Sequence, residues 1–223
     1  MTENPLFWRA AMWAGLISLD ITGCGPWMVS QPLAAGPLFG WVMGQVKVGV
    51  VIGGIVQLIW MDISPVGVGI PFDVTAVTLL AVYWASLQPD CSLAHMMLAL
   101  AAAVPLGYLF CAMDSYARRL NTVAVRRLED VPDAYLSLSL NLGILGGLAW
   151  SWIRYVIFFA LLMWGGGELW EWALRHPLPP WVDVGLTYAA ILLPVAGLGV
   201  ALELFLTEDP ERRYPSLQGF KKR

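Results

Sequence analysis

The fold of this chain is decided by GQVKVGVVIGGIVQLIWMDISPVGVGIPFDVTAVT, residues 44–78. The stretch is apolar, yet its glycines and prolines recur too often for one straight membrane helix. It also carries Lys47, Asp62 and Asp73, and ionisable residues inside a membrane mark functional sites by default. Broken backbone at membrane depth is tolerated only where protein or a water-filled cavity satisfies it. The stretch therefore predicts interrupted helices around a polar site within a bilayer.

The composition of the whole chain is that of a membrane protein. Hydrophobic residues make up 58% of the 223 residues and charged residues only 13%, whereas soluble domains are about 25% charged. The net charge of −3 gives no reason to expect a nucleic-acid partner. Three cysteines without CxxC spacing predict neither a disulfide framework nor a metal site. No phosphate-binding loop is present, and no cofactor is expected.

The apolar runs predict several helices, since about 20 helical residues cross a bilayer core of about 30 Å. We expect an all-α, polytopic integral membrane protein with broken or re-entrant helices around residues 32–87. One transmembrane domain covers residues 1–206, and a polar cytoplasmic tail covers 207–223. The predicted long spans are 6–22, 92–113, 135–164 and 184–206, and the interrupted region divides into helices 33–44, 46–61 and 74–87 with an irregular loop at 62–73.

The basic residues of the polar segments predict the orientation, because Lys and Arg concentrate in cytoplasmic loops. The predicted loop 114–133 holds four Arg and the tail holds five basic residues, so both should be cytoplasmic. The predicted loop 165–183 holds one Arg and should face outward. Arg9 places the N-terminus in the cytoplasm, and the balanced charge around it predicts an uncleaved first segment.

Asp73 stands just before the helix predicted at 74–87, which is a good N-cap position. One interpretation limits it to that cap. The other adds a ligand hydroxyl, because half-helices that begin at mid-membrane are a recurring transporter design. Neutral polyols suit carboxylate, amide and hydroxyl partners, since each sugar hydroxyl both donates and accepts. Thr75, two residues on, supplies a hydroxyl to the same candidate site.

Other polar residues of the stretch have two interpretations each. Lys47 either pairs with Asp62 or Asp73, or extends along apolar surface to the interface. Gln57 either contacts a ligand or bridges two helices through its amide, and Gln45 flanks Lys47. Asp62 lies near a helix end and is either a ligand group or a solvated loop residue.

Arg154 lies in the middle of the apolar segment 135–164, too deep to be unpaired. We expect it to form a structural salt bridge or to contact backbone carbonyls. His95 and His176 have no partner at metal-ligand spacing, so both are expected to be interfacial residues.

The run QPLAAGPLFGWVMGQVKVGVVIGGIVQLIWMDISPVGVGIPFDVT, residues 31–75, closely resembles enzyme IIC of the mannose/sorbose family of sugar phosphotransferase systems. Lys47 matches the family lysine, and Asp73 matches the aspartate of the family PPD motif. The segment LAWSWIR, residues 148–154, resembles a family helix that contains an arginine. Three departures replace two family acids and a proline, at Gln45, Gln57 and Phe72, and family members usually carry further apolar sequence beyond Leu206.

The resemblance implies a hexose-translocating subunit in the bacterial cytoplasmic (inner) membrane. Its implied partners are the membrane subunit IID and the soluble proteins IIB and IIA, and a homo-oligomer is expected. The soluble IIB protein, itself phosphorylated on a histidine, would phosphorylate the sugar, so no catalytic or phospho-accepting residue is expected in this chain. The candidate substrate-binding residues are Lys47, Gln57, Asp73, Gln45, Asp62 and Thr75.

An alternative function also fits the sequence. A degenerate relative would act as a membrane scaffold or sensor that docks phosphotransferase proteins and moves no sugar. The amides at Gln45 and Gln57 and the early end of the apolar sequence motivate it. A membrane enzyme is disfavoured, because no nucleophile–base or metal spacing occurs.

Overall fold

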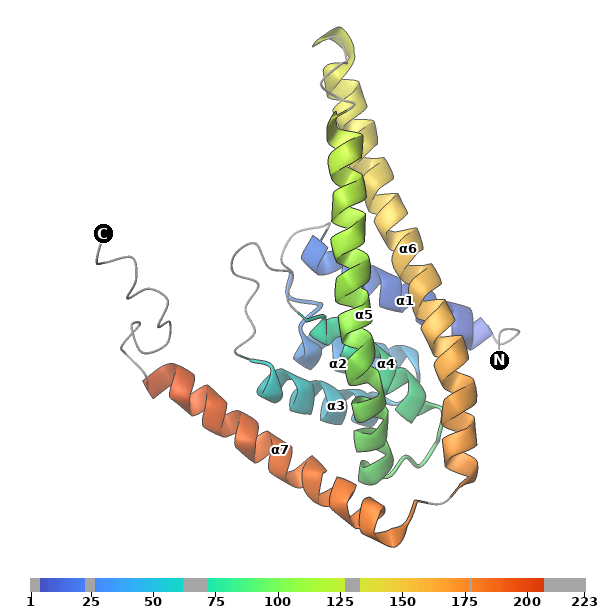
Figure 1. Ribbon diagram of the computed structural model, residues 1–223, viewed down its shortest axis with the longest axis vertical. Helices are drawn as coiled ribbons and strands as arrows, with labels where there is room; N and C mark the ends of the chain where they lie inside the picture. The colour runs from blue at the N-terminus through green and yellow to red at the C-terminus, as the bar shows by residue number, and fades with distance from the viewer. Residues whose placement is uncertain (1–4, 23–26, 62–71, 127–132, 177, 207–223) are drawn as a thin grey trace.

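The computed structural model describes residues 5–22, 27–61, 72–126, 133–176 and 178–206, and these fold into seven helices without a strand (Figure 1). In chain order the helices are α1 Pro5–Thr22, α2 Pro32–Val42, α3 Val46–Ile59, α4 Val74–Ser86, α5 Leu93–Arg126, α6 Asp133–Arg175 and α7 Pro180–Leu206.

The interrupted region is confirmed. The bounds of α2, α3 and α4 agree with the predicted helices 33–44, 46–61 and 74–87 to within two residues. Gly44 separates α2 from α3 with a φ of 75°, a conformation that glycine adopts without steric cost. Most of the predicted loop 62–73, residues 62–71 with Asp62 among them, lies outside the described residues.

Three of the described helices are long and apolar enough to cross a membrane: Leu93–Thr122 in α5, Ser139–Arg175 in α6 and Pro180–Glu203 in α7. The apolar helices α2, α3 and α4 have 11, 14 and 13 residues. At 1.5 Å per residue they reach only about 17–21 Å, less than a bilayer core of about 30 Å. The protein is therefore a polytopic all-α membrane protein whose short helices end within the apolar body.

Two predicted loops are wrong in part. The polar segment after residue 113 continues α5 as far as Arg126, and the segment after 164 continues α6 as far as Arg175. Charged residues do not end a helix that has left the bilayer, since they meet water on its exposed side. At 34 and 43 residues, α5 and α6 reach about 51 and 65 Å, longer than the bilayer with its headgroups.

Glycines bring α2 and α3 into backbone contact. Gly36 and Gly40 lie four residues apart on α2, as Gly49 and Gly53 do on α3. A methyl group on Gly36 would meet the Gly53 Cα at 2.9 Å, and one on Gly40 would meet the Gly49 Cα at 3.1 Å. Such spacing of small residues is typical of close helix pairs in membranes.

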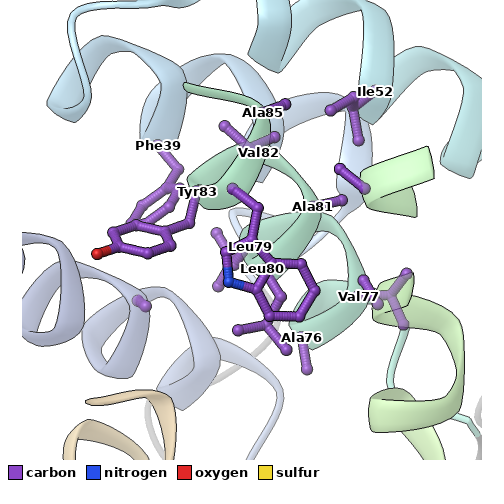
Figure 2. Close-up of a cluster of buried hydrophobic side chains, with 14 of the residues drawn as sticks. Phe39, Ile52, Ala76, Val77, Leu79, Leu80, Ala81, Val82, Tyr83 and Ala85 are labelled. Atoms are coloured by element: carbon purple, nitrogen blue, oxygen red, sulfur yellow. The ribbon is translucent and has the colours of Figure 1, made fainter. Parts of the chain in front are cut away.

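The core is built around α4, which is buried on every side from Thr75 to Ala85. Figure 2 shows its apolar side chains beside Phe39 of α2 and Ile52 of α3. A helix that is apolar all round belongs in a protein interior or a membrane. The first turn of α4 therefore lies inside the molecule, next to the other short helices.

The long helices frame this core (Figure 1). The α5–α6 hairpin runs along the longest axis, and its upper half projects beyond the remaining helices. α1 packs on α6, whereas α7 packs on α3 and α5.

Candidate functional site

The N-terminus of α4 is held by two polar side chains. The Asp73 Oδ1 accepts a hydrogen bond from the Ala76 N–H at 2.8 Å, which confirms the predicted N-cap. Thr75 is 1% exposed, and its Oγ1 donates to the Ser30 carbonyl oxygen at 2.7 Å. The predicted cap, which both interpretations share, is thus present, and an added contact with a ligand stays a prediction.

The N-terminus of α2 is capped from another helix. Its own N-cap residue, Gln31, makes no side-chain cap bond, and Pro32 occupies the first helical position. The Leu33 N–H instead donates to the Gln57 Oε1 of α3, at 3.4 Å. Gln57 therefore bridges two helices through its amide, which is one of its two predicted roles.

These contacts bring the N-termini of α2 and α4 together, since Ser30 lies two residues before α2 and Thr75 lies in the first turn of α4. Helix N-termini carry partial positive charge and N–H groups without helical partners. Two such ends, with a carboxylate and an amide beside them, gather polar groups among apolar helices. The bond from Thr75 to Ser30 is buried, whereas the bond from Leu33 to Gln57 is exposed. The arrangement can donate to and accept from the hydroxyls of a neutral ligand.

A cluster of aromatic side chains adjoins these polar residues. Phe72 directly precedes Asp73, stacks on Trp60 with 5.5 Å between ring centroids, and lies 4.7 Å from the ring of Tyr108. A methyl group at Gly107 would meet the Phe72 ring at 2.6 Å. Phe72, which stands where the family motif has proline, is thus seated between α3 and α5.

Sequence reasoning missed two residues here. Asp20, in the last turn of α1, accepts hydrogen bonds from the Trp27 N–H at 2.9 Å and from the Ser30 N–H and Oγ–H at 3.0 Å each. Both Asp20 and Ser30 are buried. An acidic residue that ends an apolar helix is a signal that could have found Asp20. Ser30 carries no such signal.

The six candidate residues do not all converge. Gln57, Asp73 and Thr75 lie around the N-termini of α2 and α4. Gln45 lies at the opposite end of α4, where its Nε2 donates to the Pro89 carbonyl oxygen at 3.1 Å. Lys47, in the first turn of α3, is exposed and forms no hydrogen bond or ion pair with another described residue. Asp62, the sixth candidate, lies outside the described residues.

Arg154 forms the predicted structural salt bridge. Its Nη2 lies 3.0 Å from the Asp114 Oδ1, which also accepts the Tyr155 hydroxyl at 2.8 Å. The side chains of Arg154 and Asp114 are 16% and 12% exposed. The pair fastens α6 to α5.

The two histidines are engaged locally. The His95 Nδ1 lies 2.7 Å from the Ser92 Oγ, and the His176 Nδ1 lies 2.9 Å from the Trp172 carbonyl oxygen.

Comparison with known proteins places the chain in a family. The family model described as "PTS system sorbose-specific IIC component" matches residues 9–210. A relative from Escherichia coli (strain K12), a putative N-acetylgalactosamine permease IIC component 2, is 30% identical over 94 residues, which is 40% of this chain and 70% of the relative.

Two solved structures share the fold. A complex of the mannose transporter ManYZ with microcin E492 matches with a TM-score of 0.61 at 18% identity, over 96% of this chain and 82% of that chain. A structure described only as a membrane protein matches with a TM-score of 0.62 at 20% identity, over 94% of this chain and 81% of that chain. Because the family model spans nearly all of the apolar sequence, the chain belongs to the family of sorbose-specific IIC components of the phosphotransferase system.

Proposed function

We propose that this chain is the sugar-translocating IIC subunit of a phosphoenolpyruvate-dependent phosphotransferase system, and that it binds a hexose where the N-termini of α2 and α4 meet. Membership of the IIC family supports the class of function. The observation that carries the site is the start of α4 inside the apolar body, capped by Asp73 and joined to Ser30 through Thr75.

The chemistry of the site suits a neutral polyol. The Asp73 carboxylate accepts from sugar hydroxyls, and the Gln57 amide nitrogen donates to their oxygens. The N-terminal ends of both helices favour electron-rich oxygens nearby. Phe72 and Trp60 add apolar surface beside these polar groups. In this proposal Lys47 and Gln45 act at the other end of α4, away from the bound sugar.

The proposed partners and location follow from the family. The chain works with a IID membrane subunit and with the soluble proteins IIB and IIA in the bacterial inner membrane, and it assembles as a homo-oligomer. Two similarities support the IID partner and the membrane location: a relative described as a permease IIC component and the fold of a mannose transporter complex. The phosphoryl group comes from IIB, so this chain binds the sugar and moves it.

Uptake in bacterial cells that lack their own route for each sugar tests the proposal. The chain is expressed with its IID, IIB and IIA partners, and labelled mannose, sorbose and N-acetylgalactosamine are supplied. We expect labelled sugar phosphate inside the cells for at least one sugar. Cells without IIB are the control, and they should accumulate no sugar phosphate.

The scaffold or sensor alternative has one observation in its favour. The amides of Gln45 and Gln57, which stand where the family has acids, both form bonds that join one element to another. A complex that assembles with IID, yet supports uptake of no hexose tested, would reject the permease proposal and favour the scaffold.

A further inference from the structure

Asp20 is a buried carboxylate whose position α1 does not itself explain. It lies in the last turn of α1 and is 7% exposed. The C-terminal end of a helix carries partial negative charge, which disfavours an acidic side chain there. A buried charge also needs hydrogen-bond partners. Those partners come from outside α1.

Residues 27–30 supply the partners. The Trp27 N–H donates to Oδ1 at 2.9 Å, and the N–H and hydroxyl of Ser30 both donate to Oδ2 at 3.0 Å. No Lys or Arg within the described ranges lies at ion-pair distance from Asp20. The two carboxylate oxygens therefore hold both ends of this short segment.

The segment between these bonds is strained. Met28 has a φ of 61°, in the left-handed region that residues with a side chain rarely adopt. Its side chain is 68% exposed, so packing of that side chain does not hold the conformation. Strained backbone persists only where its surroundings fix it, and it gathers at functional sites. The bonds from Asp20 to Trp27 and Ser30 fix it from both sides.

Ser30 links residues 27–30 to the first turn of α4. Its carbonyl oxygen accepts the Thr75 Oγ1–H at 2.7 Å, and both residues are almost fully buried, at 4% and 1% exposure. Thr75 lies two residues after Asp73, in the first turn of α4. A continuous chain of hydrogen bonds thus runs from Asp20 through Ser30 to the helix end that Asp73 caps.

We propose that Asp20 is a positioning residue of the substrate site. Its carboxylate holds residues 27–30 and thereby sets the N-terminus of α4, with Asp73, against the N-terminus of α2, with Gln57. Asp20 acts through Ser30 and Thr75 and does not itself touch the sugar. The inference rests on the proposed function, because it assigns Asp20 a role in that same site.

The test uses Asp20→Asn in the complete complex with IID. Asparagine keeps the shape but loses the charge and one acceptor, so a donor of residues 27–30 is left unpaired. We expect the Kd for mannose, sorbose or N-acetylgalactosamine, whichever the parent binds, to rise about tenfold. The KM for uptake should rise with it, and the maximal rate should change little. Hydrogen–deuterium exchange should increase at residues 74–80.

Two further variants make the test specific. Ser30→Ala removes only the hydroxyl donor to Asp20, so it should shift affinity and exchange in the same direction by less. It also carries the test if Asp20→Asn fails to assemble. Glu168→Gln changes an exposed carboxylate of α6 and should leave both measurements unchanged.

The outcomes separate the two proposals. Weaker sugar binding with unchanged exchange at 74–80 would overturn the positioning role, because Asp20 would then act on the sugar directly. Unchanged affinity would overturn it as well. A parent complex that binds none of the three sugars would reject the proposed function instead. Hydrogen–deuterium exchange at residues 74–80 of Asp20→Asn, compared with the parent, would then still decide whether Asp20 positions α4.

Discussion

Asp73 combines a cap that the structure shows with a ligand contact that we propose, and two substitutions separate them. Asparagine also caps helices well, so Asp73→Asn should keep the stability of the complex and weaken sugar binding. Asp73→Ala loses the bond to the Ala76 N–H and should cost about 1 kcal/mol of stability. Thermal unfolding and calorimetric binding measure the two effects. Normal binding by Asp73→Asn, with a poorly folded Asp73→Ala, would reduce the residue to a cap.

Lys47 is exposed and forms no hydrogen bond or ion pair with another described residue, so its removal should not disturb the fold. Lys47→Met keeps most of the apolar stem and removes the charge. Because Lys47 lies two residues from Gln45, away from the proposed sugar site, we expect the rate of uptake to fall at unchanged sugar affinity. Expression and thermal stability should stay at the level of the parent. Lost expression with normal uptake per molecule would instead make Lys47 a structural residue.

The Arg154–Asp114 pair should stabilise the protein only while both partners are present. Removing one leaves a buried charge without its partner, which typically costs about 3–5 kcal/mol. Arg154→Met should therefore lower the unfolding temperature of the purified complex strongly. The double variant Arg154→Met with Asp114→Leu should recover much of that loss, because neither charge is then left alone. A double variant no more stable than Arg154→Met would argue against this account.

The contact between α2 and α3 depends on glycines that have no room for a side chain. Gly49→Ala would push a methyl group against the Gly36 carbonyl group, 2.7 Å from its carbon, so the two helices would have to separate. We expect a loss of about 1–3 kcal/mol, as in overpacked cores. Gly54→Ala, on the same helix, meets nothing within 4 Å and is the matched control. It should be neutral or slightly stabilising, because alanine favours a helix. Equal unfolding temperatures for the two variants would contradict the close approach.

The short helices were predictable, and the C-terminal ends of α5 and α6 were not. Gly44 and the Gly/Pro-rich segment after residue 61 mark the ends of α2 and α3, because these residues disfavour a continuing helix. The polar residues beyond 113 and 164 mark no helix end. A backbone that leaves the bilayer keeps its internal hydrogen bonds, and Arg118 and Glu168 are exposed on helices that continue.

The orientation of the whole chain stays a prediction from its basic residues. With native cysteines changed to serine, a cysteine at Trp181 should react with a membrane-impermeant maleimide in intact cells. A cysteine at Lys222 should react only after permeabilisation. Labelling of Lys222→Cys in intact cells would show that the chain has the opposite orientation.

If Cys91 is kept, burial raises the pKa of its thiol to about 11, so it should react slowly with the maleimide at neutral pH.

The residues alone were enough for the class of fold, the broken helices, the Asp73 cap and the pairing of Arg154. These features follow from local rules: apolar length, glycine and proline, capping geometry and the cost of a lone buried charge. Which polar groups meet was settled by packing. The contact of Thr75 with Ser30 joins segments 45 positions apart, and spacing along the chain carries no information on such pairs. For the same reason Gln45 turned out to lie at the far end of α4 from Asp73. Asp20 did carry a signal, its charge at the end of an apolar helix, but its partners were decided by packing.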